Sequence, residues 1–139
     1  MTREDVFDFM NAHLACHLAT VEGGEPRVRG MWAYRADEKG IVFHTGTFKD
    51  LYRQLTADPA VEFCFNDFEK GIQVRVRGEA REEKDASLKE EIVAAREFLR
   101  PFVEKPDGRD QLAVFRVTEL TACVWTMDTN TEPKKLIPL

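Results

Sequence analysis

The spacing of apolar residues along the chain predicts three helices. Residues 2–14 begin with Thr2 and Asp5 at the spacing of a capping box and continue with a broad apolar face. A short helix is expected over residues 47–58, and a longer amphipathic helix over residues 84–102. The longer helix should pack its apolar stripe on a sheet.

Shorter runs of β-branched and aromatic residues predict that sheet. The expected strands are 16–21, 27–36, 41–44, 61–65, 72–81, 112–117 and 122–127, and the tail after residue 127 should be irregular. Strands joined by short turns favour antiparallel pairing, and a twisted sheet of this length tends to curl. We therefore predict an α+β, mainly β, fold: an antiparallel barrel of about six to seven strands with flanking helices, in one domain over residues 1–139.

The turn between strand 41–44 and the short helix is the first candidate for chemistry. Thr45 and Thr47 flank a glycine and precede Lys49, so the helix start offers backbone N–H groups, hydroxyls and a cation. A phosphate monoester binds to such groups. The same residues also fit a capping box in which Thr47 is the N-cap and Asp50 closes it, and both interpretations remain open.

Paired arginines form a second candidate. Arg27 and Arg29 share one face of the second predicted strand, and Arg75 and Arg77 share one face of the fifth. A guanidinium group can hold a phosphate bidentately, although ion pairs with nearby carboxylates are the usual role of such residues.

Aromatic residues and one histidine complete the candidates. Trp32, Tyr34 and Trp125 are suited to form a flat wall for an aromatic ligand, or to pack in the core. His44 lies beside the phosphate-like turn, where it would donate to an anionic ligand or cap local backbone.

Composition narrows the class of function. The 20 basic residues against 25 acidic ones give a net charge of −5, which disfavours a general nucleic-acid binder. No apolar stretch is long enough for a membrane span and the start is too acidic for a signal peptide, so we expect a soluble, cytoplasmic protein. Cys16, Cys64 and Cys123 lie far apart, which predicts reduced thiols and no structural metal site.

Three blocks of sequence, taken in order, carry a resemblance to a known family. They are Cys-His-Leu-Ala-Thr-Val-Glu-Gly-Gly-Glu-Pro-Arg-Val-Arg (16–29), Val-Phe-His-Thr-Gly-Thr-Phe-Lys-Asp-Leu-Tyr-Arg-Gln-Leu-Thr-Ala-Asp-Pro-Ala-Val-Glu (42–62) and Gln-Val-Arg-Val-Arg-Gly-Glu-Ala (73–80). Over residues 5–127 the chain resembles the pyridoxamine 5′-phosphate oxidase-like family of FMN-binding split β-barrels.

The resemblance implies a homodimer with FMN in a cleft between the subunits. Lys49 would then meet the phosphate, Gln73 would reach the flavin ring from the partner chain, and Trp125 would lie beside the cofactor. The cofactor-binding residues expected in this way are Arg27, Val28, Arg29, Met31, Trp32, His44, Thr45, Thr47, Lys49, Gln73 and Trp125.

Two departures separate the chain from the pyridoxamine phosphate oxidases themselves. Their Arg-x-His pair near the C-terminus has no counterpart here, and Phe48 stands where the arginine of their Ser-Arg-Lys run would be. We therefore do not expect vitamin B6 oxidation, and the chain looks more like the small general-stress and nitroimidazole-resistance branches of the family.

The expected function is that of an FMN-dependent oxidoreductase acting on a small aromatic or conjugated substrate. No catalytic residue can be named. Two alternatives remain. The first is a non-catalytic protein of the same fold that binds or senses flavin, or that holds haem or a deazaflavin instead. The second is a cofactor-free dimeric interaction module.

Overall fold

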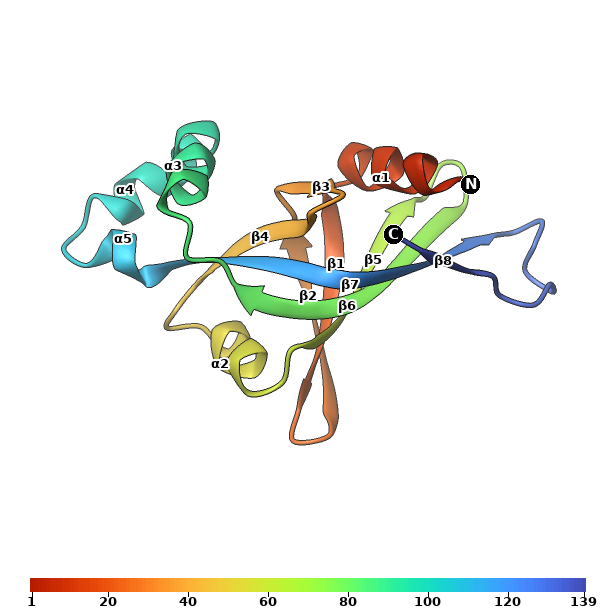
Figure 1. Cartoon of the computed structure of the whole chain (residues 1–139), viewed down its shortest axis with the longest axis horizontal. Helices are drawn as coiled ribbons and strands as arrows, with labels where there is room; N and C mark the ends of the chain where they lie inside the picture. The colour runs from red at the N-terminus through yellow and green to blue at the C-terminus, as the bar shows by residue number, and fades with distance from the viewer.

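The computed structural model describes residues 1–139, and its central feature is an eight-stranded antiparallel sheet (Figure 1). The strands are β1 (Ala15–Glu22), β2 (Glu25–Trp32), β3 (Arg35–Asp37), β4 (Gly40–Gly46), β5 (Ala60–Asp67), β6 (Ile72–Glu82), β7 (Leu112–Thr126) and β8 (Leu136–Pro138). The helices are α1 (Arg3–Ala12), α2 (Asp50–Ala57), α3 (Ala86–Ala95), the 3₁₀ turn η1 (Glu97–Leu99), α4 (Arg100–Val103) and α5 (Gly108–Gln111).

The sheet curls so that its two edges meet at one end. Its strand order is β2-β1-β5-β6-β7-β4-β3, with β8 added beside β7. The edge strands β2 and β3 are nevertheless joined by only Ala33 and Tyr34. The N–H group of Ala33 donates to the carbonyl of Leu14, just before β1, and that of Tyr34 donates to the carbonyl of Val42 in β4. Because the three steps from Trp32 to Arg35 span at most about 11 Å, the edges must lie close together here. The sheet does not close completely, which confirms the predicted α+β antiparallel split barrel.

Alternation along β4 and β7 divides the apolar residues into two clusters. Phe43 and Phe115 point into the barrel, where their rings stack with centroids 5.6 Å apart. Their neighbours Val42 and Val114 point outward and pack under α3 and α4. The segment from α3 to α5 is therefore held on the outside of the barrel, at the left of Figure 1.

Some local predictions are confirmed. Thr2 and Asp5 form the expected capping box at the start of α1. The short helix ends with Asp58 as its C-cap, directly before Pro59. The three cysteines are free. The two longest helices, α1 and α3, have ten residues each, so neither can span a bilayer.

Several predicted boundaries are wrong. Strand 27–36 is two strands, because the chain crosses between sheet edges at Ala33 and Tyr34. The two strands predicted over 112–127 are one strand, β7, in which Glu119 adopts a left-handed φ of 57° beside a register shift.

The helical segment and the tail also differ from the prediction. The single helix expected over residues 84–102 breaks at Arg96, whose side chain turns inward to bond with β2 and β4. A further short helix, α5, precedes β7, and the tail adds β8, which pairs with β7 and gives the sheet one strand more than expected. These differences depend on contacts between distant segments.

Candidate functional site

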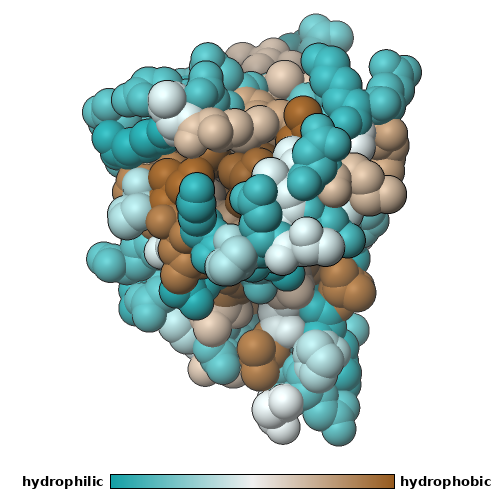
Figure 2. All heavy atoms as spheres, turned by 90° about the vertical axis from the view of Figure 1, so that its right-hand side faces the viewer, coloured by the Kyte–Doolittle hydropathy of each residue, from teal (hydrophilic) through white to brown (hydrophobic).

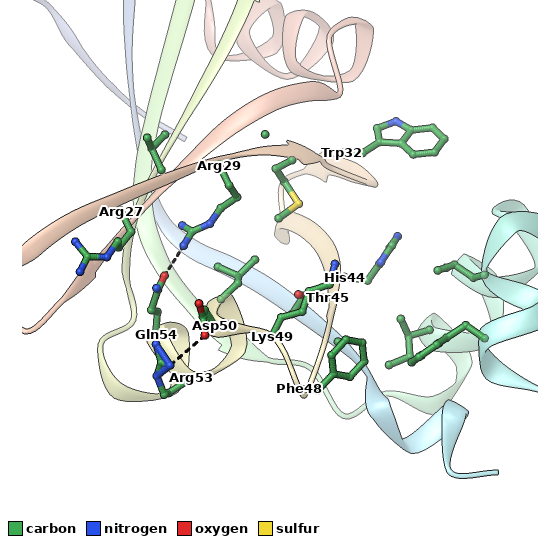
Figure 3. A pocket seen from close by; sticks show the side chains of 18 of the residues that line it. Arg27, Arg29, Trp32, His44, Thr45, Phe48, Lys49, Asp50, Arg53 and Gln54 are labelled. Atoms are coloured by element: carbon green, nitrogen blue, oxygen red, sulfur yellow. Dashed lines mark hydrogen bonds and ion pairs between the residues drawn. The ribbon is translucent and has the colours of Figure 1, made fainter. Parts of the chain in front are cut away.

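A cleft of about 840 Å³ lies between β2, the start of α2 and the helical segment that follows α3 (Figure 3). One wall is β2, the second is the junction between β4 and α2, and the third is formed by η1 and α4. This volume is within the range of about 300–1,000 Å³ that is typical of small-molecule and cofactor sites.

Most of the residues predicted to bind a cofactor line this cleft. They are Arg27, Val28, Arg29, Met31, Trp32, His44, Thr45 and Lys49. Gln73 and Trp125 do not line it. They face each other in register at the other end of β6 and β7, where Gln73 Nε2 donates to Asn66 (3.0 Å) and Trp125 Nε1 donates to Asn130 (2.7 Å).

Thr47 does not line the cleft either, and its predicted role as the N-cap of α2 is wrong. Its backbone N–H donates to the carbonyl of Gln111 (2.9 Å), which holds the turn against α5. The helix begins two residues later than expected, with Lys49 as an N-cap that makes no side-chain capping bond. The N–H groups of Asp50 and Leu51 therefore find no acceptor within the chain.

The end of the cleft formed by β2 and the start of α2 carries excess positive charge. Among the lining residues, the cations Arg27, Arg29, Lys49 and Arg53 outnumber the carboxylates Glu22 and Asp50. Arg53 pairs with both carboxylates, at 2.8 Å from Glu22 and 3.3 Å from Asp50. Lys49 makes no ion pair, and it lies beside the free N–H groups of the helix start. This end of the cleft is suited to an anion.

A buried polar network holds Arg29 at the floor of the cleft. Arg29 donates to the hydroxyl of Thr20 (2.8 Å) and to Oε1 of Gln54. Gln54 Oε1 also accepts from Thr20 (2.7 Å), and its amide donates to Glu22 (2.7 Å). Thr20 and Gln54 are both buried, and burial lowers the pKa of Arg29, but a guanidinium group stays protonated at neutral pH.

The hydroxyl of Thr45 is also available to a ligand. The residue is 95% buried, since its exposed fraction is 5%. Its hydroxyl makes no hydrogen bond within the chain, but the oxygen is not fully enclosed and keeps some exposure. The remaining access to this oxygen is through the cleft, next to Lys49 in Figure 3.

The opposite end of the cleft is aromatic. Trp32 and Phe98 stack with their centroids 5.7 Å apart, and Phe48 lies 5.9 Å from Phe102. Trp32, Phe48 and Phe98 are all more than half exposed. Large apolar side chains gathered at the rim of a cleft indicate a binding surface for a flat apolar ligand.

His44 lies between the ionic and the aromatic ends. Its Nε2 is 2.9 Å from Nη1 of Arg96. Burial, followed by the charges of Arg96 and Lys49, lowers the pKa of His44 to about 4. The ring is therefore neutral at neutral pH.

The prediction from sequence missed one wall of the cleft. Phe98 lies off the apolar stripe of the predicted helix, and an aromatic residue in that position is a signal that could have identified it. Arg53 follows Lys49 at the i, i+4 spacing, which could also have placed it in the site. Arg96 gave no such signal, because its contacts are with β2 and β4.

The second arginine pair does not belong to this cleft. Arg75 lines a separate hollow of about 190 Å³, together with His17 and Cys64. The cationic faces of β2 and β6 therefore do not meet in one site within the chain.

Comparison with known proteins identifies relatives of the chain. Residues 2–123 match the sequence profile of the family described as pyridoxamine 5′-phosphate oxidase. A pyridoxine/pyridoxamine 5′-phosphate oxidase from Mycobacterium leprae is 39% identical over 61 residues. That match covers 44% of this chain but only 28% of the relative.

Solved structures share the fold. A NimC/NimA family protein from Clostridium acetobutylicum superposes with a TM-score of 0.79 and 24% identity, covering 98% of this chain and 92% of that one. A pyridoxamine 5′-phosphate oxidase-related, FMN-binding protein from Nostoc punctiforme gives a TM-score of 0.65 and 16% identity, covering 96% and 88%.

Proposed function

Because the chain belongs to the pyridoxamine 5′-phosphate oxidase family, we propose that it is a flavoprotein whose cleft holds FMN. The observation that carries this proposal is the pairing, in one cleft, of an anion site with an aromatic site. FMN has the same two parts, a phosphate dianion and a flat conjugated ring. A relative with the same fold binds FMN.

The anion site fits the phosphate. Lys49 has no ion-pair partner, and the N–H groups of Asp50 and Leu51 have no acceptor. The hydroxyl of Thr45 is free beside them. A phosphate monoester would satisfy all of these donors at once, and the dipole of α2 favours its charge.

The aromatic site fits the ring and leaves further apolar surface. Met31 and Trp32 would pack against the ring, and Arg29 would donate to its polar edge from the buried network. Phe98 and Phe102 then remain on the opposite wall. We propose that they hold the substrate, a small aromatic or conjugated molecule.

Bound FMN would supply hydride or electron transfer at the flavin ring. The part of this chain would be to bind and orient the two rings and to keep water away from them. We propose an oxidoreductase on this basis, with no residue of the chain acting as a nucleophile.

Gln73 and Trp125 would contribute to the site only through a second copy of the chain. They pair near the start of β6 and the end of β7. These strand ends lie at the right of Figure 1, the side turned toward the viewer in Figure 2, where hydrophobic residues show between polar ones. Phe68, Met127 and Leu136 near this end are more than half exposed. These apolar residues support a homodimer in which this end covers the cleft of the partner.

The proposal predicts that Lys49→Ala weakens FMN binding by about tenfold or more, because a charge-assisted hydrogen bond contributes about 1.5–3 kcal/mol. Quenching of FMN fluorescence on titration with the purified protein measures this affinity. Lys39→Ala is the matched control, since Lys39 is also exposed and unpaired but lies in the turn between β3 and β4. Equal affinities for the two variants would contradict the placement of the phosphate.

The absorbance spectrum of the purified protein, followed by release and identification of any bound molecule, tests the cofactor itself. A flavin spectrum is expected. A haem spectrum, or a protein that stays colourless in excess FMN, would overturn the proposal.

A further inference from the structure

Arg96 is a buried cation that no carboxylate neutralises. It lies at the break between α3 and η1, where it is only 5% exposed, and it forms no ion pair. Its guanidinium group donates to the carbonyls of Trp32 (3.0 Å) and Ala33 (2.6 Å) at the end of β2. It also lies 3.9 Å from the centroid of the Trp32 ring. One side chain thus ties the helical wall of the cleft to the wall formed by β2.

The third contact of Arg96 fixes the chemistry of His44. A guanidinium group has donors only, so His44 Nε2 must accept the 2.9 Å hydrogen bond with its lone pair. A neutral imidazole carries one ring proton, which must then be on Nδ1. That nitrogen makes no hydrogen bond within the chain, and it is not fully enclosed by protein atoms. Since His44 lines the cleft, the Nδ1–H group is open to a ligand there.

The charges around the ring act in the same direction. Arg96 approaches His44 from the break between α3 and η1, and Lys49 acts on it from the start of α2. Both are cations, and the nearest aromatic neighbour, Phe98, is uncharged with its centroid 6.2 Å away. A second proton on His44 is therefore strongly disfavoured.

We propose that Arg96 is a positioning residue that holds His44 as the neutral Nδ1–H tautomer, so that the cleft presents one fixed hydrogen-bond donor between its ionic and aromatic ends. Such a donor selects a ligand with an acceptor at this place, such as a carbonyl oxygen, a nitro oxygen or an unprotonated ring nitrogen. A ligand with an N–H group there would leave two donors facing each other. The identity of the accepting molecule rests on the proposed function, whereas the tautomer of His44 does not.

Nitrogen NMR of the full-length protein labelled at histidine tests the proposal directly, because the two neutral tautomers give distinct ring-nitrogen shifts. His44→Gln identifies the signals of His44 among those of the three histidines. We expect the Nδ1–H tautomer alone, with no titration around the ordinary histidine pKa of about 6.5. A proton on Nε2, or an even mixture of tautomers, would overturn the proposal.

Variants of Arg96 test whether this residue is the cause. In Arg96→Met, His44 should become a mixture of tautomers and titrate closer to pH 6.5, whereas Arg96→Lys retains a cationic donor and should restore the Nδ1–H form at least in part. Arg35→Met is the control, because Arg35 also ties the helical segment to the sheet, through Glu91 of α3 at 2.9 Å, but does not contact His44. If Arg96→Met does not fold, the Arg96→Lys protein decides the question. An unchanged tautomer in Arg96→Met, or a change as large in Arg35→Met, would contradict the role of Arg96.

These measurements need no FMN, so they separate the two proposals. A colourless protein whose His44 is the Nδ1–H tautomer would refute the flavin proposal alone. A protein that binds FMN but carries the proton on Nε2 would refute the role of Arg96 alone. Where FMN binds, its addition should slow exchange of the Nδ1 proton with water if the cofactor accepts the bond.

Discussion

Replacement of Gln54 by leucine should destabilise the protein and loosen Arg29 in the cleft. Gln54 is 4% exposed, and its Oε1 accepts from both Thr20 and Arg29. Leucine has a similar volume but no acceptor, so the buried hydroxyl of Thr20 and the Nη2 group of the half-buried Arg29 would lose their partner. The carboxylate of Glu22 is affected less, because it keeps its contacts with Arg27 and Arg53.

The magnitude follows from these lost contacts. Each buried donor left without an acceptor costs about 1–3 kcal/mol, which gives about 2–6 kcal/mol for the two. The more apolar side chain of leucine returns about 1 kcal/mol through burial. The expected loss is therefore about 3 kcal/mol in the free energy of unfolding, a large part of the stability of a domain of this size.

Urea unfolding followed by circular dichroism measures this change. With a slope of about 2 kcal/mol per molar urea, the midpoint should fall by about 1.5 M. Gln111→Leu is the control, because Gln111 is exposed and its side chain makes no hydrogen bond, so that its effect should stay within about 0.5 kcal/mol. Similar midpoints for the two variants would refute the view that this network stabilises the floor of the cleft.

Three further outcomes are expected. First, the pKa of His44 is about 4 in the folded chain, which is lower than its ordinary value of about 6.5 in the unfolded chain. Its contribution to stability is therefore present above pH 6.5 and is lost as the pH falls toward 4. Urea unfolding at pH 7 and near pH 4.5 should show a loss about 2 kcal/mol greater in the native protein than in His44→Gln, after allowance for partial exposure of the ring. Second, Gly40→Ala should lower the unfolding free energy by about 2–3 kcal/mol in thermal denaturation, because φ is 125° and a Cβ atom would lie 2.3 Å from the carbonyl oxygen of Val117. Gly30→Ala should have almost no effect, because a Cβ atom there would meet open space, and equal melting temperatures for the two variants would contradict the strain expected from alanine at position 40. Third, Trp32→Ala should weaken FMN and riboflavin by a similar factor in fluorescence titrations, because Trp32 would pack against the ring that both molecules share. Lys49→Ala should weaken only FMN, because riboflavin lacks the phosphate, and a riboflavin affinity that depends on Lys49 would refute the division of the cleft into two ends.

The parts of the fold that were predictable depend on neighbours in sequence. Thr2 and Asp5 are three residues apart, so the capping box of α1 was visible directly. Pro59 constrains the residue before it, which set the end of α2. The run of β-branched residues that includes Val74 and Val76 located β6 in the same way.

The parts that could not be predicted depend on partners far along the chain. The crossing at Ala33 and Tyr34 exists because β3 pairs with β4 rather than continuing β2. The break at Arg96 exists because its side chain finds acceptors in β2 and β4, more than fifty residues away. Neither feature leaves a periodic signal in its own segment.

The candidate site divides along the same line. Residues of β2 and of the turn before α2 were found because each group is contiguous, and the family resemblance added their role. Phe98 was not found, because it enters the cleft only when the helical segment packs on the outside of β4 and β7.

The central place of β7 affects how this chain must be assembled during synthesis. β7 pairs with β4, β6 and β8, and its pairing with β4 joins residues such as Ile41 and Val117, which are 76 positions apart (117 − 41). Until β7 leaves the ribosome, β4 has no long partner and the apolar rings of the barrel face water. Ribosome-bound chains that stop at residue 111 should therefore stay sensitive to protease, whereas chains released beyond residue 126 should become resistant in a single late step.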